Sequence, residues 1–299
     1  MFMCSGRPTG AGAHPSTILQ TFRLPEPVKG ELELRFRPTG KEKADTAAVE
    51  NTVSEIIMPK SYLAEYVQYL GNAVPKDTLN VLCVGNSFTY YWGCPAMLKE
   101  IAWNEGHYLR VKSTLKGGQT LGDHLALPVS RNVVNAGRYD FAFFQDQSQS
   151  PARYASDTTQ FDYVNTNFLK LTDRLLSRSR NCRVILESTW SFEKDDFGGF
   201  GSHAAFDSLM TIGTSMMVRN ASKIFGANDF EVSPIGRAFS IVRNENPGID
   251  LYSADSKHQS DYGSYLKACV NYLMIFRKPF QSQPADGATS SIDCGILHD

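Results

Sequence analysis

The sequence lacks the features that mark several classes of protein. Its six cysteines form no Cys-x-x-Cys pair and no cluster with histidine at the spacing of zinc ligands, so they indicate neither a disulfide framework nor a metal site. No run of about 18 apolar residues occurs, which excludes a transmembrane helix. Lys and Arg number 30 against 31 Asp and Glu, and a formal net charge of -1 gives no electrostatic footprint for a nucleic acid or an anionic membrane.

The start of the chain also lacks the pattern of an export signal. Residues 1–7 have neither the charged beginning nor the long apolar stretch of a secretory signal peptide. The sequence as given therefore indicates a soluble protein that is not exported, and a periplasmic or secreted location would require an upstream region. The oligomeric state stays open.

The composition is sufficient for a globular core, because 42% of the 299 residues are hydrophobic and 11% are aromatic. The first 60 residues differ from the rest, since residues 17–24 loosely and residues 31–37 strictly alternate apolar and polar side chains. Alternation with a period of two predicts half-buried, antiparallel strands, with residues 47–58 as a third. So few strands cannot bury a core alone, so residues 1–60 must pack on the main domain or be the remnant of a β-sandwich.

A second pattern, in which strands alternate with helices, begins near Asn80 and belongs to a main domain at residues 61–299. Short, continuous apolar runs are typical of a parallel sheet that is buried on both faces. Candidate strands lie at residues 81–84, 108–113, 141–144, 183–187 and 230–232. Candidate helices lie at residues 95–105, 121–135 with a break at Pro128, 159–179, 204–225 and 262–276. This alternation predicts a three-layer α/β/α sandwich with a five-stranded parallel sheet.

A serine stands at the end of the first strand of this pattern. Val81-Leu82-Cys83-Val84 runs directly into Gly85-Asn86-Ser87, and α/β proteins carry their chemistry at the carboxyl ends of their strands. A serine becomes a nucleophile only where a histidine base, itself oriented by an acid, can reach it. Asp255 and His258, three residues apart near the other end of the chain, supply such a pair. The sequence therefore predicts a serine hydrolase.

Four separated segments within residues 80–279 resemble the sequence blocks of the SGNH/GDSL hydrolase superfamily, in an uncharacterised bacterial branch. In the first, VLCVGNSFTYY, Ser87 matches the nucleophile and Asn86 stands in place of the more usual Asp. In the last, LYSADSKHQSDYGSYL, Asp255 and His258 match the Asp-x-x-His of the family, and Gln259 replaces the usual Pro. The resemblance implies a flavodoxin-like fold and a Ser-His-Asp triad.

The two middle blocks resemble those that complete the family's oxyanion hole, together with the backbone N–H of Ser87. In KGGQTLGDHL, Gly118 matches the glycine whose N–H points into the hole, and the alternative is an ordinary loop with Thr120 as a helix N-cap. YDFAFFQDQSQSP lacks the family's oxyanion asparagine, and counting from the strand entrance places Gln147 at its position. A longer amide can still donate an N–H, and Gln145 is the rival candidate.

Four residues are candidates for contact with a substrate. Asn86 and Gln145 belong to the first and third blocks, next to the expected nucleophile and oxyanion donor. Trp190 follows the fourth predicted strand, and aromatic faces stack on sugar rings, although such side chains are equally typical of a core. His203 follows a glycine-rich segment that is typical of a cleft wall, whereas His124 lies in a helical pattern and is predicted to be packed or hydrogen-bonded structurally.

Together these features predict carboxyl-ester hydrolysis with no metal or organic cofactor. The resemblance implies a small or glycan ester as the substrate, with short acyl groups, acetyl above all, on a carbohydrate. Two alternatives stay open: a carbohydrate-binding protein that kept the fold without catalysis, and an acyltransferase that passes the acyl group to a sugar.

Overall fold

The computed structural model describes residues 2–4, 18–20, 77–194, 199–226 and 229–279. The chain divides into two units, residues 1–76 and 77–299. In the first unit, β1 (Phe2–Cys4) pairs with β2 (Ile18–Gln20) in an antiparallel ribbon, in which Met3 lies opposite Leu19. β2 falls within the strand predicted at residues 17–24. The predicted strands at residues 31–37 and 47–58 lie outside the described residues.

The second unit is built on a five-stranded sheet, in which every neighbouring pair is parallel. Its strands, in the order β4-β3-β5-β6-β7, are β3 (Leu79–Gly85), β4 (Leu109–Leu115), β5 (Phe141–Phe144), β6 (Arg183–Glu187) and β7 (Phe230–Ser233). This is the predicted fold class. The bounds predicted for β5 and β6 are those observed, because β5 is an apolar run and β6 is an apolar run between one Arg and one Glu.

The helices differ more from the prediction than the strands do. They are α2 (Ser87–Tyr90), the 3-10 helix η1 (Tyr91–Gly93), α3 (Cys94–Asn104), α4 (Leu121–Ala126), α5 (Pro128–Asn135), α6 (Ser150–Ser156), α7 (Asp162–Leu176), α8 (His203–Phe225), α9 (Ile235–Glu245) and α10 (Asp261–Phe276). The sequence pattern did not predict α2, α6 or α9. For α9 the signal is present, because Ile235, Phe239 and Val242 recur at helical spacing and are buried. Of the described helices, none is long and apolar enough to cross a membrane.

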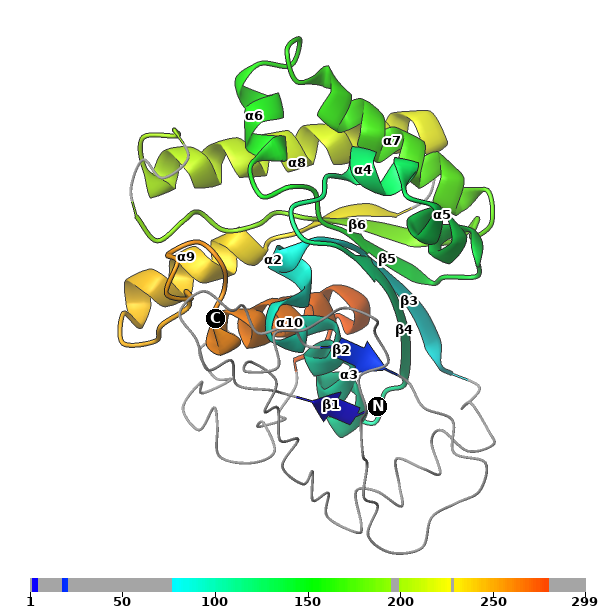
Figure 1. The fold of residues 1–299 in the computed structure, drawn as a ribbon, viewed down its shortest axis with the longest axis horizontal. Helices are drawn as coiled ribbons and strands as arrows, with labels where there is room; N and C mark the ends of the chain where they lie inside the picture. Colours follow the sequence, from blue (N-terminus) through cyan, green and yellow to red (C-terminus); the bar gives the residue numbers. More distant parts are fainter. Residues whose placement is uncertain (1, 5–17, 21–76, 195–198, 227–228, 280–299) are drawn as a thin grey trace, which may run out of the picture. The chain divides into compact units, whose positions relative to one another are not determined.

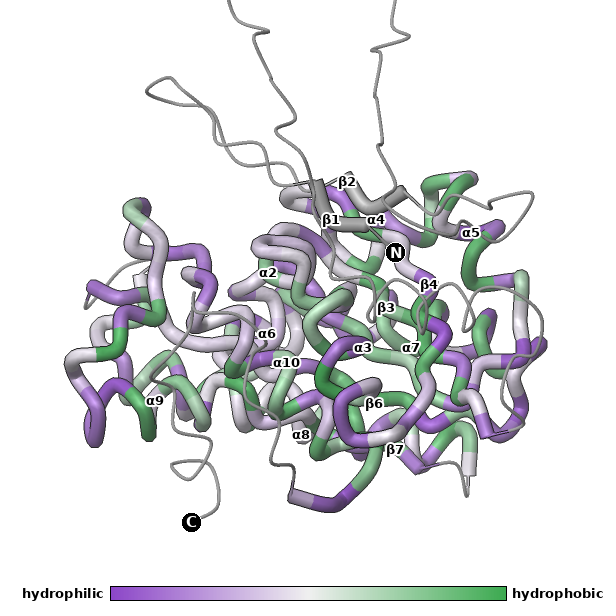
Figure 2. Tube along the Cα trace, turned by 90° about the horizontal axis from the view of Figure 1, so that it is seen from below, coloured by the Kyte–Doolittle hydropathy of each residue, from purple (hydrophilic) through white to green (hydrophobic). Residues whose placement is uncertain are grey.

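Helices cover both faces of the sheet (Figure 1), and successive residues of a strand point to opposite faces. Leu82, Val84 and Phe144 belong to a core shared with α4, α5, α7 and α8. Val81 and Phe143 belong to a second core shared with α3 and α10 on the other face. Figure 2 shows the hydrophilic segments of this unit gathered at outer loops and helix ends. Burial of both faces of the sheet explains why its strands are continuous apolar runs rather than alternating ones.

The strand order creates the place for a site. Because β3 lies between β4 and β5, the connections leave β3 and β5 in opposite directions at neighbouring carboxyl ends. Ligands of open α/β sheets bind in the crevice at such a switch point. Ser87 follows β3 and Gln145 follows β5, so two of the motif segments meet there.

Candidate active site

Three side chains form a hydrogen-bonded series at this edge of the sheet. The Oγ of Ser87 lies 2.8 Å from Nε2 of His258, although the two residues are 171 positions apart in the chain. Nδ1 of His258 lies 2.5 Å from Oδ2 of Asp255. A carboxylate only accepts, so Nδ1 carries the proton and Nε2 is left to accept the hydroxyl proton of Ser87. The structure thus brings the predicted serine, histidine and aspartate together in the order that a triad requires.

The turn that carries the acid and the base is closed by the acid itself. Oδ1 of Asp255 accepts hydrogen bonds from the backbone N–H of Lys257 at 3.1 Å and of His258 at 2.9 Å. Ser256, which stands between Asp255 and Lys257, has a φ of 57°, a left-handed conformation that few residues other than glycine adopt. Burial opposes ionisation of Asp255, but the hydrogen bonds from the side chain and backbone of His258 outweigh it and lower the pKa of this carboxyl. The carboxylate therefore both folds the turn and orients the imidazole.

Aromatic rings hold the imidazole from the sides. Tyr91 stacks on His258 with ring centroids 4.3 Å apart and an interplanar angle of 17°, and Phe88 lies against it at 5.3 Å. Trp190 is stacked on Phe88 and donates its Nε1–H to the backbone carbonyl of Lys257 at 3.1 Å. The base is thus fixed by a local turn and by packing on the residues that follow the nucleophile.

The nucleophile turn is held on one side by His124. Its Nε2 lies 2.9 Å from the carbonyl oxygen of Gly85, which can only accept, so Nε2 carries the proton. Nδ1 then accepts from Ser130 Oγ at 2.9 Å, and Thr114 Oγ1 contacts Ser130 at 2.7 Å. Burial lowers the pKa of His124 and keeps it neutral, which suits this arrangement. The structural role predicted for this histidine is confirmed.

The same turn is held from β5 by Gln145. Its Oε1 accepts from the backbone N–H of Asn86 at 2.9 Å and from Thr89 Oγ1 at 3.0 Å. Asn86 in turn is the N-cap of α2, accepting from Phe88 N at 3.1 Å and donating its amide to the carbonyl of Gln119 at 2.9 Å. These bonds fix the first turn of the helix that begins with Ser87.

The loop of Gly118 lies beside the nucleophile turn. The side-chain amide of Asn86 donates to the carbonyl of Gln119 in this loop, and the backbone N–H of Lys116 donates to the carbonyl of Gly85 at 3.1 Å. Gly118 has a φ of +70°, and a Cβ added there would meet no atom within 4 Å, so its backbone is open on that side. Thr120 is the N-cap of α4, as the alternative interpretation of this segment expected. The two interpretations are compatible, because the cap fixes the loop that carries the glycine.

Gln147 lies on the turn that follows β5. The side chain of Asp146 connects this turn to the start of α4. Oδ1 of Asp146 accepts from Leu121 N at 3.0 Å and from Gln147 N at 2.7 Å. Burial raises the pKa of Asp146 to about 6, although these two hydrogen bonds oppose the rise. The amide of Gln147 donates to Ser148 Oγ at 3.2 Å and its Oε1 accepts from Gln149 N at 3.1 Å, so these side-chain bonds stay within the turn and do not reach Ser87. Nε2 has two protons, so one stays available for a ligand.

The structure corrects the roles expected for three of the four candidate substrate residues. Gln145 and Trp190 have no exposed surface and Asn86 is 2% exposed, so a substrate cannot reach them. All three instead support the turn of the nucleophile or the base. His203 is half-buried, and its Nδ1 contacts Ser191 Oγ at 3.1 Å and Arg243 at 3.0 Å, so its contact with a substrate stays a prediction. Their burial depends on contacts between distant segments, which motif spacing does not report.

Sequence reasoning missed Gln259 as part of the site. Its Nε2 donates to the carbonyl of Ser87 at 3.3 Å, and its own carbonyl accepts from Trp92 Nε1 at 3.1 Å. It was read only as a departure from the family's proline. A buried amide directly after the base was the available signal.

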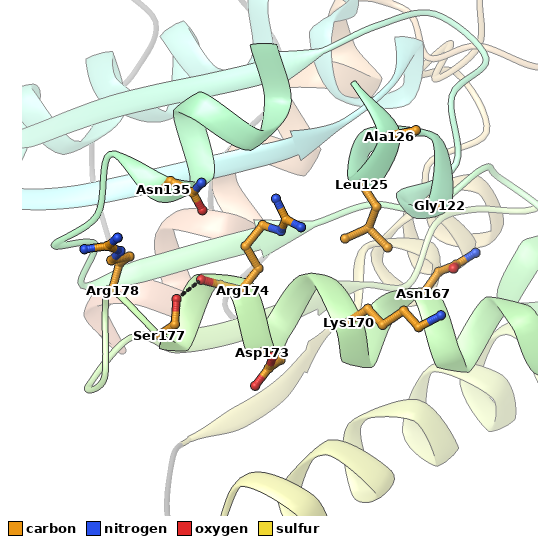
Figure 3. Close-up of a pocket in the computed structure, with 10 residues that line it drawn as sticks. All are labelled: Gly122, Leu125, Ala126, Asn135, Asn167, Lys170, Asp173, Arg174, Ser177 and Arg178. Atoms are coloured by element: carbon orange, nitrogen blue, oxygen red, sulfur yellow. Dashed lines mark hydrogen bonds between the residues drawn. The ribbon is translucent and has the colours of Figure 1, made fainter. Parts of the chain in front are cut away.

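The described residues also form a groove away from this site. It has a volume of about 740 Å³ and lies between α4, α5 and α7 (Figure 3). Its lining residues are Gly122, Leu125, Ala126, Asn135, Asn167, Lys170, Asp173, Arg174, Ser177 and Arg178. None of these belongs to the hydrogen-bonded series of Ser87. Within the described ranges, no three His, Cys, Asp or Glu side chains gather in an arrangement that could hold a metal ion.

Solved structures with the same fold are known. A DUF4886 family protein from Bacteroides uniformis ATCC 8492 is 17% identical, with a TM-score of 0.54 over 71% of this chain and 88% of that one. Axe2, an acetylxylan esterase from Geobacillus stearothermophilus, is 14% identical, with a TM-score of 0.50 over 70% of this chain and all of the other (100%). No family model and no curated protein sequence matches the chain. The likeness confirms the predicted fold class, an α/β protein with a five-stranded parallel sheet.

Proposed function

We propose that the protein is a serine esterase of the SGNH type, which hydrolyses short-chain carboxyl esters. The observation that carries this proposal is the series from Ser87 through His258 to Asp255, with contacts of 2.8 and 2.5 Å. Such a series at the switch point of a parallel sheet has the geometry of nucleophile, base and orienting acid. The fold shared with an acetylxylan esterase agrees with it.

In this mechanism Ser87 Oγ attacks the acyl carbon while its proton passes to Nε2 of His258. The imidazolium then gives that proton to the leaving alcohol, and an acyl-serine remains. Water attacks the acyl-serine, again with Nε2 as the base, and releases the carboxylic acid and the free serine. Asp255 keeps the proton on Nδ1 throughout and stabilises the imidazolium that forms at each step.

The negative oxygen of each tetrahedral intermediate needs donors that are already in place. We assign them to the backbone N–H groups of Ser87 and Gly118 and to the side-chain amide of Gln147. The burial of Gln145 supports the choice of Gln147, since a fully buried amide cannot meet a substrate. The open side of Gly118 supports the second donor.

We further propose that the ester is an acetyl group on a carbohydrate. Trp92 stands five residues after the nucleophile and is 42% exposed, which is unusual for so large an apolar side chain. Its Nε1–H is tied to Gln259 O, so the ring is held in a fixed orientation. A fixed aromatic face suits the stacking of a sugar ring. This residue takes the role that the sequence had suggested for Trp190.

The test begins with p-nitrophenyl acetate and the variants Ser87→Ala and Ser156→Ala, since Ser156 is exposed on α6 and serves as the matched control. We expect hydrolysis by the wild type and by Ser156→Ala only. A mass-spectrometric screen of acetylated glycans then identifies the substrate, and addition of a sugar acceptor separates a hydrolase from an acyltransferase. An inactive wild type on every ester would overturn the proposal in favour of a binding protein.

A further inference from the structure

A fully buried ion pair lies beneath the nucleophile helix α2. Nζ of Lys267, on α10, is 2.6 Å from Oε2 of Glu187, the last residue of β6, and the two side chains are 0% and 1% exposed. The burial of two charges costs several kcal/mol for each ion, and a well-packed apolar pair is often as stable. Stability alone therefore does not explain the pair.

The pair is completely hydrogen-bonded, and its bonds lead to the nucleophile. Lys267 Nζ also donates to the backbone carbonyl of Phe88 at 2.9 Å and to Thr89 Oγ1 at 3.0 Å. These contacts and the carboxylate use all three of its protons. The other oxygen of Glu187 accepts from Asn271 Nδ2 at 2.7 Å, so the carboxylate is fixed as well.

A helix as short as α2 needs this support. It spans only Ser87–Tyr90, so its carbonyls cannot all find partners within the helix. Lys267 supplies the partner of Phe88 O, and a cation is favourable at the carbonyl end of a helix. Thr89 Oγ1 continues the network to Gln145 Oε1 at 3.0 Å, which accepts from Asn86 N on the other side of Ser87.

We propose that Lys267 and Glu187 are positioning residues for the nucleophile, a role that rests on the proposed esterase function. The pair holds α2 at one height above the sheet, so that Ser87 Oγ stays in line with Nε2 of His258. Neither residue touches the substrate. Their loss changes how often the serine and the base are aligned, and leaves the substrate-binding surface unchanged.

The experiment compares the wild type with Lys267→Met/Glu187→Gln, which removes both charges together and keeps the side-chain volumes. Three quantities are measured: the melting temperature, kcat and KM for p-nitrophenyl acetate, and the rate at which a fluorophosphonate probe labels Ser87. We expect a folded variant whose kcat and labelling rate both fall at least tenfold while KM changes less than threefold. The control is Phe168→Leu, in the core on the opposite face of the sheet, which lowers the melting temperature and leaves kcat and labelling unchanged.

A second pair of variants keeps the proposal testable if the double variant does not fold. Thr89→Val removes the hydroxyl that Lys267 and Gln145 share, and Thr89→Ser retains it. We expect a tenfold loss of labelling in the valine variant and near wild-type labelling in the serine variant. Equal labelling of both, or a folded double variant with wild-type labelling, would overturn the positioning role and leave the esterase function intact. A wild type that neither hydrolyses the ester nor is labelled at Ser87 would overturn both.

Discussion

The turn of the nucleophile and the turn of the base are built by opposite means. Around Ser87, which is 9% exposed, the backbone is held by side chains from distant elements, among them His124 and Gln145. The side chain of Asp255 is 39% exposed, and its turn is held by its own carboxylate and by short-range backbone bonds. The comparison teaches that contacts between distant elements shape the turn of the nucleophile, whereas the turn of the base closes by itself and is then packed against Tyr91, Phe88 and Trp190.

The largest effects are expected from the two residues at which these regions meet. Ser87→Ala and His258→Ala should each lower the turnover by several orders of magnitude, because each removes a reacting group. The melting temperature should change little in Ser87→Ala and should fall somewhat in His258→Ala, whose ring packs on Tyr91 and Phe88. The control is His107→Ala, whose ring stacks on Phe276 and belongs to none of the triad motifs. Activity above about a tenth of the wild type in either variant, under ~1.4 kcal/mol of barrier, would exclude the assigned triad.

Asp255→Asn separates the two tasks of the acid. The amide oxygen can still accept the N–H groups of Lys257 and His258, so we expect the turn and the melting temperature to be retained. The amide can also donate to Nδ1 and favour the unproductive tautomer, and serine proteases lose roughly 10⁴ in turnover by this route. Steady-state kinetics at neutral pH measures the loss. An unchanged rate would mean that another group orients the imidazole.

The two glutamines after β5 are predicted to have different roles, because Gln147 is expected to contact the substrate and Gln145 to support the turn of the nucleophile. Gln147→Ala should lower kcat by ~10²–10³, or about 2.7–4 kcal/mol, with a smaller change in KM and none in melting temperature. Gln145→Ala should instead lower the free energy of unfolding by about 1–3 kcal/mol, because the buried N–H of Asn86 loses its acceptor. Steady-state kinetics gives kcat and KM of both variants, and urea unfolding gives their free energies of unfolding. A loss of kcat confined to folded Gln145→Ala would overturn the oxyanion role of Gln147 and show that support of the nucleophile turn by Gln145 matters more.

The smallest expected effect concerns the carboxyl of Asp146. Its pKa is about 6 in the folded protein because of burial, above the ordinary value of 3.8, so the folded state binds a proton that the unfolded chain releases between those values. Its contribution to stability is therefore complete below about pH 4 and is lost as the pH rises through about 6. We expect the wild type to lose roughly 1–3 kcal/mol more than Asp146→Asn between pH 4 and 7.5 in urea unfolding. Parallel pH curves for the two proteins would contradict this.

The sequence predicts best the features that are local. The strands Phe141–Phe144 and Arg183–Glu187 can be recognised in the sequence because burial on both faces leaves apolar residues throughout the first and in the middle of the second. The spacing of Asp255 and His258 is legible because one tight turn joins them. The residues that support the nucleophile cannot be recognised in the sequence, since Lys267 and Glu187 are 80 residues apart and meet only after the sheet has formed. The sequence around Trp190 also does not show whether its ring is buried in the core or exposed to stack on a sugar.

Trp92 also gives the site an optical reporter. Of the three tryptophans, Trp190 has no exposed surface, whereas Trp92 is 42% exposed and bonded to Gln259 O beside the base. A water-soluble quencher of indole fluorescence therefore reaches Trp92 and not Trp190, and the variant Trp103→Phe removes the signal of the partly exposed third ring. A ring stacked on Trp92 would shield it, so occupancy of the site can be followed by fluorescence without a label and without turnover.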